Sequence, residues 1–145
     1  MRAVVQRVSE AKVEVDGQII GQIGAGVLVL LAIANNDQLE AIDKMAAKIA
    51  NLRLFADAAG KMNLSLIDVG GQVLVVSQFT LLADCQKGKR PSFGLAASAD
   101  KAEDYYQQFI RRLKAKGLKV QTGRFGAKMQ VSLINDGPVT FIIDY

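Results

Sequence analysis

Polar side chains follow one of the most apolar segments of this sequence. The tetrapeptide Ser77-Gln78-Phe79-Thr80 comes directly after Val73-Leu74-Val75-Val76. Hydroxyl and amide groups that begin where an apolar strand leaves the core are placed to bind or react with a ligand. Two chemistries are open: Thr80 as a covalent nucleophile, or backbone N–H groups that stabilise a developing oxyanion.

A second polar segment, Asn135-Asp136-Gly137-Pro138-Val139-Thr140, separates two strand-like runs near the end of the chain. Asn, Asp and Gly tolerate left-handed turn geometry, and proline removes a backbone donor. An ordinary turn with a trans proline is the simpler interpretation on base rates. The functional interpretation is that the two polar strand ends together form one site.

The residue types that are missing limit the chemistry. The chain has no histidine and a single cysteine, Cys85. A Ser-His-Asp or Cys-His apparatus is therefore impossible, and a conventional zinc site lacks its ligands. We expect no metal and no cofactor, so that a hydrolase built on this sequence relies on positioning and backbone hydrogen bonds. A lone cysteine also predicts a reducing, cytoplasmic setting.

Positive charge is concentrated in one part of the chain. Residues 87 to 128 contain eleven basic and three acidic residues, whereas the rest contains seven basic and eleven acidic ones. This asymmetry favours a polyanionic partner such as nucleic acid. We expect Lys87, Lys89 and Arg90, in a glycine-rich loop, to bind phosphates. The alternative is an exposed loop beside a helix whose basic end complements the helix dipole.

The 145 residues predict a single domain, 1–145, of mixed α/β class. The longest apolar run, residues 27–34, is too short to cross a bilayer, and the first residues lack a signal-peptide pattern. Periodicity predicts two helices, 38–51 with Asn36 or Asp37 as its cap, and 98–116. The predicted strands are 2–8, 12–15, 18–23, 27–33, 62–66, 73–77, 118–121 and the two runs around Pro138, with turns at Asp16-Gly17 and Gly24-Ala25-Gly26.

Together, the two polar segments resemble the signatures of the D-aminoacyl-tRNA deacylase family, which have the forms SQFT and NxGPxT. The similarity extends from the first strand to the last. The order of the predicted elements indicates a mixed sheet with helices packed on it. The resemblance refines this to a mixed, partly barrel-like antiparallel sheet with two main helices packed on it, and a homodimer. It also implies hydrolysis of the ester between a D-amino acid, or glycine, and the 3′-terminal adenosine of tRNA, with L-aminoacyl groups rejected.

The resemblance also implies roles for individual residues. Ser77, Gln78, Phe79 and Thr80 correspond to the segment at the reacting ester. Gly137 and Pro138 correspond to a cis Gly-Pro bond that reaches into the site of the partner subunit, and Arg7 to the arginine that holds this bond in place. The residues that correspond to the adenosine pocket are Ala102, Phe125 and Met129.

Two other functions compete with this interpretation. A non-catalytic RNA-binding module would use the same basic face but leaves the paired polar strand ends unexplained. A generic threonine-dependent esterase would not need the basic asymmetry. Within the deacylase interpretation, the 2′-hydroxyl of the RNA or a bound water can serve as the reacting group, and no base for Thr80 is visible in the sequence.

Overall fold

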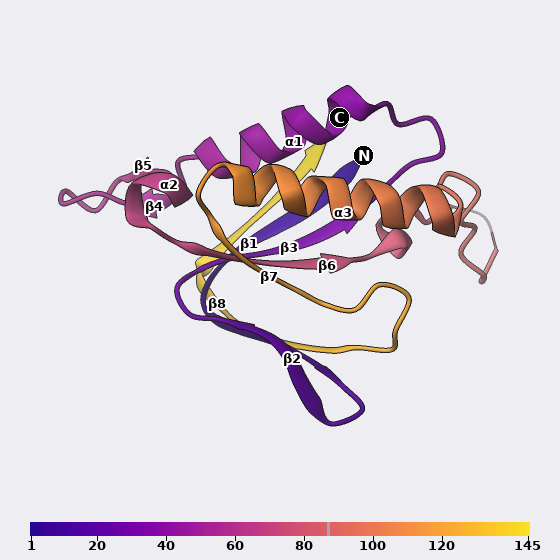
Figure 1. Ribbon diagram of the computed structural model, residues 1–145, viewed down its shortest axis with the longest axis horizontal. Helices are drawn as coiled ribbons and strands as arrows, with labels where there is room; N and C mark the ends of the chain where they lie inside the picture. Colours follow the sequence, from indigo (N-terminus) through magenta and orange to yellow (C-terminus); the bar gives the residue numbers. More distant parts are fainter. Residues whose placement is uncertain (87) are drawn as a thin grey trace.

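The computed structural model describes residues 1–86 and 88–145 (Figure 1). Two helices, α1 (Leu39–Asn51) and α3 (Ala99–Ala115), lie side by side over one face of a six-stranded sheet. The strands of this sheet are β1 (Arg2–Val15), β2 (Gln18–Ile23), β3 (Gly26–Ala32), β6 (Gln72–Ser77), β7 (Lys119–Thr122) and β8 (Gln130–Asp144). Smaller elements are β4 (Phe55–Ala56), β5 (Met62–Leu64), α2 (Leu66–Val69) and a 3-10 turn, η1 (Phe79–Leu82).

The sheet is mixed, as predicted, and only part of it is antiparallel. Strand β1 pairs antiparallel with β2, β3 and β8, but β3 pairs parallel with β6, and β6 parallel with β7. The parallel pairs arise because a helix lies in each connection, between β3 and β6 and between β6 and β7. As a result, β3 and β6 end at the same edge of the sheet.

The two central strands are apolar throughout because both of their faces are covered. Along β3, Val27, Val29 and Leu31 face the helices, whereas Leu28 points into a second core enclosed by the curled sheet. Along β6, Val73 and Val75 pack on the helix side and Leu74 and Val76 on the other. Such two-sided burial explains why these strands read as continuous apolar runs instead of alternating ones.

The sheet curls until its ends almost meet. The long strand β1 pairs with β3 through residues 2–8 and with β2 through residues 11–15, so β2 comes round to face β7. At this contact a Cβ on Gly21 would lie 2.5 Å from the carbonyl oxygen of Thr122. The absence of a side chain at Gly21 therefore permits the near closure of the barrel.

Several local predictions need correction. Asp37 does not cap α1: it is buried, and its carboxylate binds the α-amino group of Met1 at 2.5 Å and the N–H of Ala34 at 2.7 Å. Helix α1 begins at Leu39 instead of residue 38. The strand predicted for 62–66 ends at Leu64, and the short helix α2 follows with Ser65 as its cap.

The two runs around Pro138 form one strand. Strand β8 runs from Gln130 to Asp144 and pairs with β1 along its whole length, with register shifts where Arg7 lies opposite the Gly137–Pro138 segment. The ordinary-turn interpretation is therefore wrong. No other strand in the described residues pairs with the second edge of β8. None of the described helices is long and apolar enough to cross a bilayer.

Gly24 and Gly26 were both predicted to be turn residues, but only Gly26 lies against another strand. A Cβ at Gly26 would lie 1.9 Å from the carbonyl oxygen of Gln72, whereas the nearest atom at Gly24 is 4.0 Å away. We expect Gly26→Ala to lower the free energy of unfolding by about 1–3 kcal/mol or more, because β3 and β6 must separate. Gly24→Ala, the matched control, should change it little. Urea unfolding measures the free energy of unfolding of both variants. Equal losses of stability would contradict the claim that the close contact between Gly26 and Gln72 requires glycine.

Candidate active site

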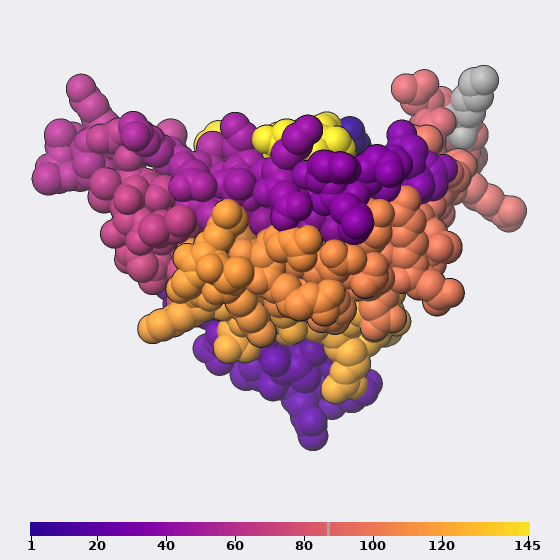
Figure 2. Space-filling view, turned by 45° about the horizontal axis from the view of Figure 1, so that its top comes forward, coloured from indigo at the N-terminus to yellow at the C-terminus, as the bar shows by residue number. Residues whose placement is uncertain are grey.

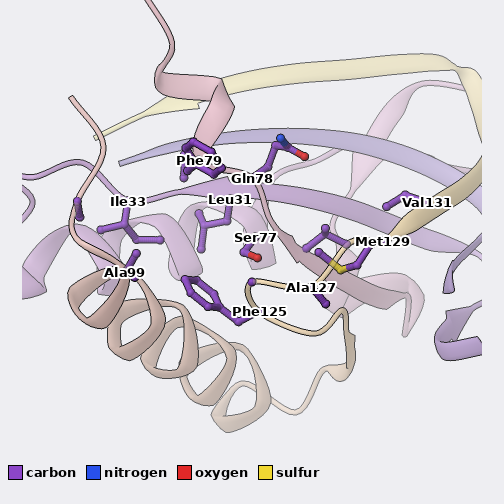
Figure 3. Close-up of a pocket in the computed structure, with 15 residues that line it drawn as sticks. Leu31, Ile33, Ser77, Gln78, Phe79, Ala99, Phe125, Ala127, Met129 and Val131 are labelled. Atoms are coloured by element: carbon purple, nitrogen blue, oxygen red, sulfur yellow. The ribbon is translucent and has the colours of Figure 1, made fainter. Parts of the chain in front are cut away.

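A cavity of about 510 Å³ opens at the carboxyl ends of β3 and β6 (Figure 3). This edge of a sheet with parallel strands is where α/β proteins commonly bind ligands. Four segments line the cavity: the end of β3, the end of β6 with the start of η1, the start of α3, and the loop from β7 to β8. The lining residues are Leu31, Ala32, Ile33, Val76, Ser77, Gln78, Phe79, Ala97, Ala99, Ala102, Phe125, Gly126, Ala127, Met129 and Val131.

All three residues assigned to an adenosine pocket line this cavity. Ala102 faces it from α3, and Phe125 and Met129 face it from the β7–β8 loop. The Phe125 ring is fixed by the buried ring of Tyr106, whose centroid is 5.9 Å away. The side chains of Phe125 and Met129 provide flat, apolar and polarizable surface, which suits a purine ring.

Three of the four residues in the first motif also line the cavity: Ser77, Gln78 and Phe79. In Figure 3, Ser77 lies between Leu31 and the loop that carries Phe125 and Met129. Thr80 is not among the lining residues, and its hydroxyl accepts a hydrogen bond from the amide of Gln78. The structure therefore brings the cavity residues together but directs the Thr80 hydroxyl to Gln78.

The backbone at this motif presents free donors. The strand ends with the N–H of Gln78 bonded to the carbonyl of Leu31, at 2.8 Å. The next two N–H groups belong to Phe79 and Thr80. They lie at the start of η1, where no earlier turn of the helix supplies a carbonyl acceptor, and no other acceptor for them occurs within residues 1–86 and 88–145. Adjacent unpaired N–H groups beside a cavity can bind an oxyanion.

The conformation of the second motif is stabilised by hydrogen bonds from its own side chains and from Arg7. The Gly137–Pro138 bond is cis, as the resemblance implied. The Arg7 guanidinium donates to the carbonyl oxygens of Asp136 at 2.9 Å and Leu54 at 2.6 Å. Asn135 accepts from the N–H of Val139 at 2.8 Å and donates to the hydroxyl of Thr140 at 2.9 Å. The segment is thus held from both sides in one conformation.

The two motifs do not meet within one chain. Ser77 is in register with Leu31, whereas Arg7 is in register with Val27, four residues earlier on β3. That offset is about 13 Å along the strands, and β8 is three strand spacings, about 14 Å, from β6. Neither Arg7, Gly137 nor Pro138 lines the cavity. Within a single chain the two strand ends therefore do not form one site, and the prediction that they meet across two subunits stays a prediction.

The basic residues are placed only in part. Lys89 and Arg90 are exposed on the loop that follows η1, and Lys87 lies outside the described residues. This loop reaches the cavity through Phe93, whose ring contacts Phe79 with 5.0 Å between centroids. In the described part of the chain, no three His, Cys, Asp or Glu side chains are grouped so that they could hold a metal ion.

Several residues of the site carry no pattern by which they could have been predicted from the sequence. Ala97 and Ala99 line the cavity because helix α3 begins at its edge, and Leu31 and Ile33 because β3 runs parallel to β6. The carbonyl of Leu54 accepts a hydrogen bond from Arg7, although the two residues are 47 positions apart in the sequence. Knowledge that β3 and β6 are parallel neighbours would have identified the residues at the end of β3, because adjacent parallel strands end together.

Comparisons with known proteins agree with this geometry. Residues 4–144 match the family model described as D-Tyr-tRNA(Tyr) deacylase. The D-aminoacyl-tRNA deacylase of Thermosipho africanus (strain TCF52B) is 56% identical over 99% of this chain and 97% of its own length. That of Clostridioides difficile (strain 630) is 55% identical over the same shares.

Solved structures extend the match. The c-Myc DNA Unwinding Element Binding Protein superposes with a TM-score of 0.94 at 43% identity, over 100% of this chain and 99% of its own. A probable eukaryotic D-amino acid tRNA deacylase shares the fold, with a TM-score of 0.88 over 99% and 98% of the two chains, at 18% identity. Fold and site thus define an ester hydrolase of the deacylase type. The chain belongs to the D-aminoacyl-tRNA deacylase family, as its two motifs implied.

Tyr106 packs behind the cavity, against Phe125. Its buried hydroxyl donates to the carbonyl of Val75 at 2.8 Å, and burial raises its pKa well above the ordinary value of 10.0. We expect Tyr106→Phe to cost about 1 kcal/mol of stability, because the Val75 carbonyl keeps its bond from the N–H of Gly123.

The same substitution distinguishes a structural role of Tyr106 from a role in proton transfer. Since the folded pKa is raised, wild type should lose stability as pH rises above about 10, and Tyr106→Phe should lose less. The pH profile of kcat/KM below that pH should be the same in both proteins. Loss of a titrating limb in the Phe variant would show that Tyr106 takes part in proton transfer.

Proposed function

We propose that the active site of this chain is completed by a second copy of it. As a member of its family, the chain hydrolyses the ester bond of D-aminoacyl-tRNA, a proofreading reaction of translation. The observation that carries the proposal is the separation of the two motifs, with the cavity at one edge of the sheet and Gly137–Pro138 remote from it. In a homodimer, each β8 reaches into the cavity of the other subunit.

The exposed side of β8 supports this dimer. The strand is 15 residues long and, within the described residues, pairs on one edge only. Ile134 and Ile142 are 55% and 68% exposed on it. A long strand edge with exposed apolar side chains is a site of association unless something covers it. A second copy covers both the strand edge and the apolar side chains.

In the proposed complex, the terminal adenosine lies between Ala102, Phe125 and Met129. Its ester then reaches the N–H groups of Phe79 and Thr80, which stabilise the oxyanion that forms when the carbonyl is attacked. One such donor is worth about 10²–10³ in rate. Because an aminoacyl ester is already activated, the reaction needs no histidine, and the attacking group is a water or the 2′-hydroxyl of the RNA.

Chirality is selected by main-chain atoms in this proposal. The carbonyl oxygens of the Gly137–Pro138 segment of the partner subunit accept hydrogen bonds from the α-amino group, which all amino acids share. A D-residue then directs its side chain to solvent, and glycine has none to place. The side chain of an L-residue clashes with the backbone of the Gly137–Pro138 segment. Arg7 serves selection indirectly, by holding the carbonyl of Asp136.

The exposed Lys89 and Arg90 attract the phosphates of the acceptor strand. Lys87, two positions before Lys89 in the sequence, is a further candidate. Each phosphate neutralised on a single strand contributes about −0.7 to the slope of log K against log salt. A cytoplasmic location follows from this substrate. The alternative function is nucleic-acid binding without turnover, favoured by the name of the similar c-Myc DNA Unwinding Element Binding Protein.

Mixed dimers test the composite site. Ala102→Trp fills the adenosine pocket, and Arg7→Ala frees the Gly137–Pro138 segment, so each homodimer should lose most hydrolysis of D-aminoacyl-tRNA. In a heterodimer of the two, one site receives both intact halves. Random re-association makes about half of the dimers mixed, each with one of two sites intact, so about a quarter of wild-type activity should return.

The outcome separates the three interpretations. No recovery on mixing, with mixed dimers shown to form, would contradict the cross-subunit site. Binding of tRNA without ester loss in the wild type would favour the binding module. As a matched control, mixing either variant with itself after the same treatment should recover nothing.

A further inference from the structure

The rim of the cavity carries a pair of aromatic rings that have no part in the proposed reaction. The rings of Phe79 and Phe93 meet edge to face, with centroids 5.0 Å apart and planes at 63°. Their residues are nevertheless 55% and 39% exposed. Phe79 lines the cavity and Phe93 does not, so the pair leads from the cavity to the outer surface.

The backbone around Phe93 is tied to the rest of the fold. Ser92 exchanges two hydrogen bonds with Asp84, at 2.8 and 2.9 Å, and the carbonyl of Phe93 accepts from Ala96 at 3.0 Å. On the other side, the N–H of Asn35 bonds to the carbonyl of Leu95 at 3.0 Å. The backbone that carries the ring is therefore held in place, which lowers the entropy that would be lost when a ligand stacks on the ring.

The charge next to the pair identifies the ligand class. Lys89 and Arg90 are exposed on the same loop, and neither forms an ion pair within the described residues. In Figure 2, residues of this part of the chain, 84–86 and 88–95, lie at one end of the molecule. Exposed aromatic faces beside free positive charge are the features that bind single-stranded nucleic acid, because bases stack on rings while cations attract phosphates.

We propose that the Phe79–Phe93 pair stacks the base that precedes the terminal adenosine in the acceptor strand. This inference rests on the proposed function, because an adenosine in the cavity fixes where the preceding nucleotide leaves it. Stacking accepts any base, since every base has a π face. The pair therefore strengthens binding of the single-stranded end of tRNA without selecting among tRNAs.

Two substrates test the proposal: full D-aminoacyl-tRNA, and D-aminoacyl-adenosine, which lacks the preceding nucleotides. Phe93→Leu keeps an apolar side chain but removes the ring. We expect it to lower kcat/KM about 5- to 150-fold on the tRNA substrate, the range for loss of one base stack. On the adenosine substrate the change should stay within about two-fold, and Phe93→Trp should restore activity on tRNA.

Ile67→Ala is the matched control. Ile67 is 45% exposed on α2, at the opposite end of the molecule from the loop that carries Phe93 (Figure 1), and its loss should affect neither substrate. Equal losses on both substrates, or no loss on tRNA, for Phe93→Leu would overturn the proposal. Failure of the wild type to hydrolyse either substrate would instead contradict the proposed function. Binding of uncharged tRNA still decides the stacking claim in that case: Phe93→Leu must weaken it and Phe93→Trp must not.

Discussion

The structure depends on the parallel pairing of two strands that are buried on both faces. Strands β3 and β6 lie between the helices on one side and the interior of the curled sheet on the other. Because they are parallel, they leave the core at the same edge, where the apolar side chains stop and Ser77 and Gln78 begin. The free N–H groups of Phe79 and Thr80 follow at once, since the chain turns too tightly there to pair them. One packing constraint thus supplies both the cavity and its donors.

The same sheet explains why the two motifs lie apart within one chain. Strand β1 pairs antiparallel with β3. Arg7, which binds the Gly137–Pro138 segment, therefore lies several residues away from the edge where the cavity opens. No rearrangement of side chains can close that gap, because Arg7 is fixed in a strand whose register is set over seven residue pairs. A site that uses both motifs therefore needs two copies of the chain.

Much of this fold was accessible from the sequence, and the exceptions have physical causes. The hairpin at Asp16-Gly17 and both long helices were predicted correctly to within a residue or two, because local periodicity and turn chemistry encode them. The parallel pairing of β3 with β6 was not, because it depends on a crossover that no local pattern records. Asp37 was assigned as a cap because its type suits one, whereas the α-amino group of Met1, 36 residues away, binds it. Family resemblance indicated Ala102, Phe125 and Met129, which line the cavity, and their contact with adenosine stays a prediction. Ala97 and Ile33 were missed because small and aliphatic side chains carry no chemical signal.

The absence of histidine is compatible with catalysis because the substrate is already reactive. In the proposed mechanism, oriented N–H groups, and an α-amino group held by main-chain carbonyls, provide the positioning that the reaction requires. Main-chain atoms also suit an enzyme that has to distinguish configuration while accepting many side chains. A pocket for the side chain would achieve the opposite, selecting by size and polarity instead.

The most direct measurement of this claim is kcat/KM for one tRNA charged in turn with a small D-residue, a large D-residue, glycine, and the two L-counterparts. Selection by main-chain atoms predicts comparable values for both D-residues, hydrolysis of the glycyl ester, and rejection of both L-residues. Comparable hydrolysis of the L- and D-esters, or a strong dependence on the size of the D-side chain, would contradict it.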